Sequence, residues 1–276
     1  MEENLMFENI SIGIKTFLRD EQLFNTIQAI RTNLPGMQML IADCGEMTDQ
    51  KDGLYAELER EGHVHIDSPF DAGFGVMSNA IADTLKRPYL LVGSDDFEFG
   101  TPEVRQGIEK LIYTANLYPN FDVFSGRVNN NPYEFLLRDL GNGVMEEEAC
   151  GIIPHPDFPQ DYYWVYLTVN YSLIRKRVFE KVRWDDEVKI GGGEHAAWFI
   201  DANKAGFNVA WVPGVNINEQ QIRNSSRYNM YRRRAQDPAR PCFVRRGIKK
   251  YVCGNGVVDY DETTTTGDQN AFNQKS

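Results

Sequence analysis

The first hundred residues alternate short apolar runs with segments of helical periodicity, and no other feature constrains the fold as strongly. The apolar runs at residues 10–16, 37–42, 63–66 and 88–92 predict four strands. Between them, apolar side chains recur at the three- and four-residue spacing of helices. This alternation predicts an α/β fold, a Rossmann-like and mostly parallel sheet with helices on both faces. Ligands of such sheets bind beyond the carboxyl ends of the strands, so we look for a functional site there.

The second half of the chain is less regular. Residues 111–132 and 162–174 are expected to be mainly strands, and 178–182 a short helix. A longer helix is predicted at 195–206, followed by a strand at 208–212 that ends at Pro213-Gly214. From about residue 254 the chain is polar, and we expect a mobile tail at 254–276.

The charge of the chain is unevenly distributed. Its net charge is −11, yet residues 221–253 hold ten basic residues and one acid, so this segment carries +9 and the remainder −20. Such a segment is expected to face an anionic partner, although it could instead pair with the protein's own acids.

Composition also bounds the location of the protein. The sequence has no run of ~18 apolar residues, and its start lacks the layout of a secretory signal. Its four cysteines are scattered, as is typical of free thiols in a reducing compartment, although a Cys242–Cys253 disulfide is an alternative. We therefore expect a cytoplasmic protein without a membrane span.

The strongest local motif is Ser94-Asp95-Asp96, directly after an apolar strand. Adjacent carboxylates at a sheet edge are costly unless a cation compensates them. Hard oxygen ligands suit Mg²⁺ or Mn²⁺ that also bridges substrate phosphates. The alternative is a turn with solvated acids.

Three further segments end strands or begin helices on the same expected edge. Asp43 ends the second strand, and Asp71 with Gly73 precedes the helix that contains Asn79. Glu194 and His195 follow three glycines, where a carboxylate at a helix start could serve as a general base. Each segment could equally be an ordinary turn or helix cap. The glycines near residue 73 do not match a dinucleotide-binding loop, and no Walker phosphate loop is present.

Taken in this order, these features resemble the nucleotide-sugar glycosyltransferases with the GT-A fold. The similarity is to family-2-like enzymes and vertebrate β-1,4-N-acetylgalactosaminyltransferases, and it covers about residues 10–231. It implies a catalytic domain over residues 1–220, with a nucleotide-binding half (1–100) and an acceptor-side subdomain (101–220). The basic segment 221–253 would close over the site.

The resemblance also implies roles for single residues. Asp96 would bind the metal, and Asp95 would contact sugar or ribose. Other donor-binding positions would be Thr16, Arg19, Asp43, Asp71, Gly73, Asn79, Arg223, Arg227 and Arg232. The acceptor side would contain Trp184, Gly192 and Gly193. Relatives often carry the base one position after the glutamate, so the base is Glu194, which we favour, or His195.

One departure concerns the metal. Such enzymes commonly add a histidine ligand after the last core strand, and residues 215–219 contain none. Asn218, or Glu219 beside it, would have to take its place.

The resemblance thus implies a metal-dependent, inverting transfer of sugar from a nucleoside diphosphate sugar, with UDP as the expected nucleotide, to an acceptor hydroxyl. The +9 segment favours an anionic acceptor such as a hydroxymethylated pyrimidine in bacteriophage DNA. A glycan precursor is the other acceptor. A nucleotidyltransferase and a non-catalytic sugar-nucleotide binding module are alternatives from other classes.

Overall fold

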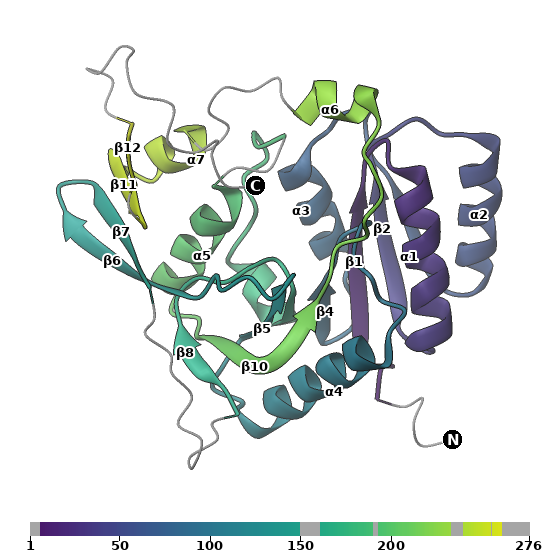
Figure 1. The fold of residues 1–276 in the computed structure, drawn as a ribbon, viewed down its shortest axis with the longest axis horizontal. Coiled ribbons are helices and arrows are strands. Elements are labelled where there is room, and N and C mark those ends of the chain that lie inside the picture. The colour runs from purple at the N-terminus through teal and green to yellow at the C-terminus, as the bar shows by residue number, and fades with distance from the viewer. Residues whose placement is uncertain (1–5, 150–160, 190–192, 233–239, 255, 261–276) are drawn as a thin grey trace.

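The computed structural model of the chain describes residues 6–149, 161–189, 193–232, 240–254 and 256–260. Within these ranges, eight strands form one large sheet (Figure 1). In spatial order they are β3 (Val64–Asp67), β2 (Gln38–Asp43), β1 (Ile10–Thr16), β4 (Tyr89–Val92), β9 (Ser172–Arg175), β5 (Val123–Val128), β10 (Val209–Ile217) and β8 (Tyr163–Val165). The first four strands are parallel, and so are β5 and β10, whereas β9 and β8 run antiparallel to their neighbours.

Helices cover both faces of this sheet (Figure 1). Helices α1 (Asp20–Asn33), α2 (Asp49–Arg60) and α4 (Pro102–Leu117) share one apolar cluster, and α3 (Phe74–Thr84) and α5 (Glu194–Lys204) share another. The strands supply both clusters because successive side chains point to opposite faces. In β2, for example, Met39 and Ile41 join the first cluster, whereas Leu40 and Ala42 join the second. The predicted α/β architecture is therefore confirmed.

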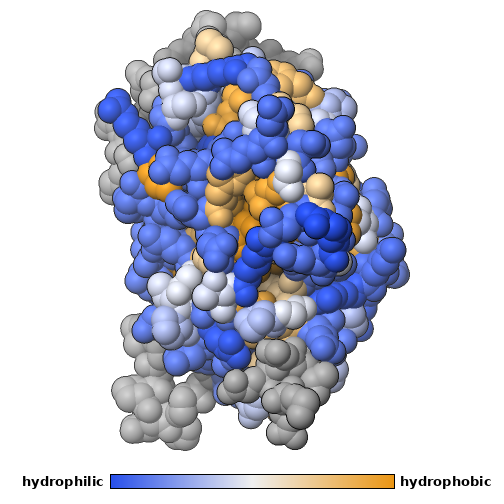
Figure 2. Space-filling view, turned by 90° about the vertical axis from the view of Figure 1, so that its right-hand side faces the viewer, coloured by the Kyte–Doolittle hydropathy of each residue, from blue (hydrophilic) through white to orange (hydrophobic). Residues whose placement is uncertain are grey.

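The side of the molecule on which α1 and α2 lie is largely hydrophilic, with an apolar strip near its centre (Figure 2). A cavity of about 300 Å³ there is lined by Phe24, Ile27 and Leu54. Beside it, the guanidinium of Arg31 is 2.8 Å from carboxylates of both Glu57 and Glu61. Arg31 thus bridges two acids at the surface of the molecule.

A smaller sheet packs beside α5 and α7 (Arg240–Arg245) and joins the end of the described chain to its middle (Figure 1). Its order is β12 (Gly256–Asp259), β11 (Lys250–Cys253), β7 (Val144–Ala149) and β6 (Phe135–Gly141). Tyr260 is buried, with its ring 5.3 Å from that of Phe243. The expected tail from residue 254 is thus wrong for residues 256–260, and residues 261–276 lie outside the described part.

Two other expectations for the second half need correction. Residues 111–117 belong to helix α4, whose start is fixed by the Thr101 hydroxyl accepting from the Val104 amide. Strand β10 does not end at Pro213 but continues to Ile217. Its pairing with β5 shifts register between Trp211 and Asn216, so the proline falls at an irregularity where no ladder hydrogen bond is lost.

The other predicted elements of this half are present. The short helix is the 3-10 helix η2 (Lys176–Glu180), and the longer one is α5. Among the described residues, no helix has both the length and the apolar character needed to cross a bilayer. Cys44, Cys242 and Cys253 are free thiols, as expected.

Candidate active site

A cavity of about 630 Å³ lies where β1 and β4 end, and residues of helix α6 (Ser226–Arg232) line part of it. It brings together residues that lie far apart in the sequence. The predicted site residues that line it are Thr16, Arg19, Asp71, Gly73, Asp96, Glu194, His195, Arg223 and Arg232. The parallel strands explain this convergence, since their carboxyl ends meet at one edge of the sheet.

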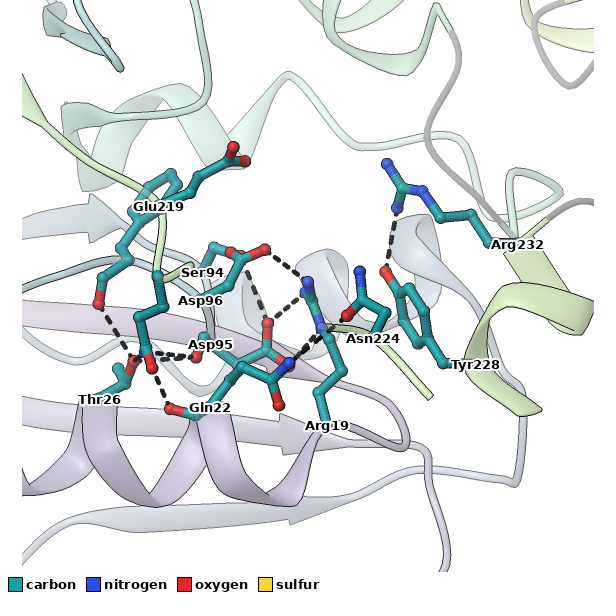
Figure 3. Close-up of polar contacts among 12 residues, drawn as sticks. Arg19, Gln22, Thr26, Ser94, Asp95, Asp96, Glu219, Asn224, Tyr228 and Arg232 are labelled. Atoms are coloured by element: carbon teal, nitrogen blue, oxygen red, sulfur yellow. Dashed lines mark hydrogen bonds and ion pairs between the residues drawn. The ribbon is translucent and has the colours of Figure 1, made fainter. Parts of the chain in front are cut away.

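The acidic pair after β4 is held by Arg19. The Asp95 side chain is fully buried and that of Asp96 is 19% exposed, and the Arg19 guanidinium forms ion pairs with both (Figure 3). The Ser94 hydroxyl donates to the second oxygen of Asp96. Burial raises the pKa of Asp95 to about 6, although the charge of Arg19 acts in the opposite direction. The pair is thus a desolvated anionic group that needs a cation.

Lys15 is a second cation of the site, and the sequence analysis missed it. Its side chain is buried in β1, donates to the carbonyl oxygen of Gly93 at 3.1 Å and lines the cavity. Burial lowers its pKa to about 8, partly offset by the charges of Asp95, Asp96 and Glu194. A lysine within an otherwise apolar strand was the available signal, because a buried charge requires partners.

Glu194 and His195 also line the cavity. Gly193, in a left-handed conformation with φ of 77°, begins helix α5, and the Glu194 carboxylate is buried in its first turn. The His195 Nε2 atom is 3.2 Å from Glu194 Oε1. Burial lowers the pKa of His195, which favours the neutral imidazole, while the charge of Glu194 acts in the opposite direction. The two candidate bases therefore lie next to each other in the cavity.

Helix α6 covers the cavity and is anchored at its rim. The ring of Tyr231 packs edge-on against Phe17 and Phe70, with centroids 5.2 and 5.7 Å away. Arg227 forms an ion pair with Glu46 and does not line the cavity. This predicted diphosphate ligand therefore holds the helix in place instead.

Three other predicted residues lie outside the lining of the cavity. The Asp43 carboxylate accepts from the Tyr55 hydroxyl at 2.7 Å and the Gly45 amide at 2.8 Å, and Lys51 lies 3.1 Å away. Asn79 exchanges hydrogen bonds of 2.9 Å with the backbone of Trp184. The Trp184 ring is buried, 5.7 Å from the ring of His195. These three side chains thus contact the residues around the cavity and do not line the cavity itself.

Of the two residues expected in place of the missing histidine ligand, Asn218 and Glu219, the second is the better placed. The Asn218 side chain accepts from Asn216 at 3.1 Å and does not line the cavity, whereas Glu219 does. Asn129 orients the Glu219 carboxylate with a 2.9 Å hydrogen bond. Gly192, the remaining predicted acceptor residue, lies outside the described residues, and Gly193 begins the helix without lining the cavity.

Much of the basic segment pairs with the protein's own acids. Arg245 and Arg246 both contact Asp185, and Arg246 also contacts Asp201. Lys250 lies 3.8 Å from Asp259, and Arg227 is paired as described above. For these four residues the structure favours the alternative weighed from the sequence, an internally compensated charge. Arg233 and Arg234 lie outside the described residues.

The sheet order, the acidic motif after β4 and the cavity at the strand ends define a GT-A fold, and solved structures agree. The chain is similar to residues 1–349 of S. aureus TarS, with a TM-score of 0.51, 12% identity, and coverage of 76% of this chain and 60% of that fragment. It is similar to GalNAc-T7 in complex with UDP, GalNAc and Mn²⁺, with a TM-score of 0.58, 11% identity, and coverage of 76% and 43%. The predicted fold class is thus confirmed.

Sequence comparison leads to more specific relatives. The chain is 26% identical to β-1,4 N-acetylgalactosaminyltransferase 2 of Mus musculus over 213 residues, 76% of this chain and 39% of the relative. It is 29% identical to β-1,4 N-acetylgalactosaminyltransferase 1 of Homo sapiens over 119 residues, 43% of this chain and 20% of the relative. The chain thus spans less than half the length of these relatives. No protein-family model matches it. The resemblance predicted from the sequence is confirmed.

Proposed function

We propose that this chain is a glycosyltransferase that moves a sugar from a nucleoside diphosphate sugar, with UDP as the nucleotide, to an acceptor hydroxyl. The observation that carries the proposal is the cavity itself, which combines an acidic pair held by Arg19, further cations and a carboxylate at a helix start. The similarity to N-acetylgalactosaminyltransferases, and to GalNAc-T7 with its UDP and Mn²⁺, supports the same reaction class.

In this proposal the cations of the cavity bind the diphosphate. Arg223 and Arg232 are exposed on its wall, and their planar guanidinium groups suit phosphate oxygens. Thr16, Asp71 and Gly73 also line the cavity and would provide the remaining donor contacts. Charge that develops on the departing diphosphate is stabilised by fixed cations, which act strongly in a cavity that excludes water.

The residues present fit a divalent cation, Mn²⁺ or Mg²⁺. Such ions are held by one or two protein carboxylates together with substrate phosphates, so the pair Asp95 and Asp96 is a sufficient protein contribution. The Arg19 guanidinium stands where a cation is required. Asp96 would hold the ion, with Glu219 as the nearest further carboxylate of the cavity wall. Bound there, the ion would neutralise charge on the diphosphate.

Glu194 is proposed as the general base that takes the proton of the acceptor hydroxyl. Its carboxylate lines the same cavity as Asp96, and attack from the side away from the leaving group would invert the anomeric carbon. His195, whose Nε2 atom lies 3.2 Å from Glu194 Oε1, would orient this carboxylate. We thus assign the base to Glu194 and the orienting role to His195.

For the acceptor we propose a glycan hydroxyl. Hydroxymethylated pyrimidine in DNA was the acceptor favoured by the charge of residues 221–253, but four of these basic residues are paired with acids of the protein. Nucleic-acid affinity depends on basic residues that are free to contact phosphates. Strong, salt-dependent binding to hydroxymethylated DNA at low ionic strength would restore the DNA acceptor.

The experiment is a screen of UDP-sugars for thermal stabilisation and for UDP release, with and without Mn²⁺. A bound donor raises the melting temperature because it stabilises the native state. Asp96→Asn should abolish UDP release while the protein stays folded. Asp83→Asn is the matched control, since Asp83 is an exposed acid on α3 that pairs with Arg183 outside the cavity. Full activity of Asp96→Asn would refute the metal assignment, and binding without UDP release would indicate a non-catalytic binding module.

A further inference from the structure

Arg19 links the acidic pair to the helix that covers the cavity. On one side its guanidinium contacts Asp95 and Asp96, and on the other it lies 4.9 Å from the ring centre of Tyr228 on α6 (Figure 3). Arg232, from the same helix, donates to the Tyr228 hydroxyl at 3.1 Å. The Arg19 side chain is 14% exposed, so the ion pairs are largely shielded from water.

Each carboxylate oxygen of the acidic pair already accepts a hydrogen bond. Arg19 donates to both oxygens of Asp95 and to one oxygen of Asp96, and Ser94 donates to the other. A divalent cation binds through the same oxygens, and a guanidinium beside it would add strong repulsion at low dielectric. Metal binding therefore requires that Arg19 leave the acids.

We propose that Arg19 is the resident cation of the acidic pair, and that it exchanges places with the divalent metal when a nucleoside diphosphate binds. The inference rests on the proposed function. The displaced guanidinium would remain in the cavity that Arg223 and Arg232 line, where a diphosphate is the anion able to receive it. Arg19 is thus a positioning residue that couples metal affinity to donor affinity, and the coupling is reciprocal.

The test measures Mn²⁺ binding, not turnover, from the electron paramagnetic resonance signal of free Mn²⁺. Without nucleotide, Arg19→Gln should bind Mn²⁺ at least about tenfold more tightly than the wild type, within the usual range of coupling between sites. UDP should increase Mn²⁺ affinity more in the wild type than in Arg19→Gln, because only the wild type has a guanidinium to displace. Equal affinities of the two proteins, with and without UDP, would overturn the exchange.

Arg31→Gln is the matched control. Arg31 lies on α1, the helix that Arg19 precedes, and also bridges two carboxylates, but it does not line the cavity, so its removal should leave Mn²⁺ affinity unchanged. An increase in Arg31→Gln equal to that of Arg19→Gln would refute a specific role for Arg19.

Two measurements keep the proposal testable if Arg19→Gln folds poorly. Arg19→Lys retains the charge but reaches fewer carboxylate oxygens, so it should bind Mn²⁺ more tightly than the wild type by a smaller factor. Mn²⁺ should also raise the melting temperature of Arg19→Lys more than that of the wild type. If no protein, wild type or variant, binds Mn²⁺ even with UDP, the proposed metal site is refuted. If all bind Mn²⁺ with the same affinity, only the exchange of Arg19 with the metal is refuted.

Discussion

Lys15→Met should change how the stability of the protein depends on pH. Lys15 is buried among the cavity cations, and its pKa falls from 10.5 to about 8 on folding because burial disfavours the charged form. Between these two values the unfolded chain keeps the proton that the folded chain has lost. Stability rises with pH wherever the unfolded state binds more protons, so the wild type should gain stability from Lys15 between pH 8 and pH 10.5.

The size of this gain follows from the pKa difference. One pKa unit corresponds to about 1.4 kcal/mol, so raising the pH from 7 to 10 should add about 2 kcal/mol to the free energy of unfolding through Lys15. Methionine has a similar length and no charge, so Lys15→Met lacks this contribution. The difference in stability between wild type and variant should therefore shift by about 2 kcal/mol in favour of the wild type.

The assay is urea unfolding of both proteins at pH 7 and pH 10, because other titrating groups cancel in the comparison. Lys86→Met is the control, since Lys86 is an exposed lysine outside the cavity and the same charge is removed. A shift in Lys15→Met no larger than in this control would refute the description of Lys15 as a buried, destabilised cation.

Three further predictions concern packing, the base and the metal. Gly75→Ala should cost about 1–3 kcal/mol of stability, because the added Cβ would lie 1.9 Å from the carbonyl oxygen of Asp185. Gly53→Ala is the control and should cost no stability, because the added Cβ meets open space. Equal melting temperatures of the two variants would contradict this packing. Glu194→Gln should lower kcat about 10²–10⁴-fold, and His195→Gln should lower it less, since it orients the base; the reverse order would assign the base to His195. Chelation by EDTA should stop sugar transfer and added Mn²⁺ should restore it, and transfer that persists in EDTA would rule out the metal.

Much of the fold could be predicted because apolar periodicity reports directly on burial. The first four strands and three helices were identified this way, and the strand ends then indicated which loops converge. Asp96, Arg19 and Glu194 meet in one cavity for this reason. The helix over residues 111–117 was missed because its β-branched and aromatic side chains, such as Ile112 and Tyr113, are typical of strands.

The partners of individual side chains could not be predicted. Asp43 and Tyr55 lie on neighbouring elements, but nothing in the sequence indicates that the hydroxyl and the carboxylate meet. Asn79 binds the backbone of Trp184, 105 positions along the chain. Arg19 was expected to face the donor and instead faces the acids. Such contacts depend on rotamers and on the tertiary approach of distant segments, which local patterns do not encode.

The most direct test of the account is a crystal structure of the protein grown with UDP and Mn²⁺, with anomalous diffraction used to locate the metal. We predict an anomalous peak beside the Asp96 carboxylate, the diphosphate in the cavity beneath α6, and Arg19 moved from the acids toward the phosphates. A cavity without nucleotide at saturating UDP, or no manganese peak next to Asp96, would contradict it.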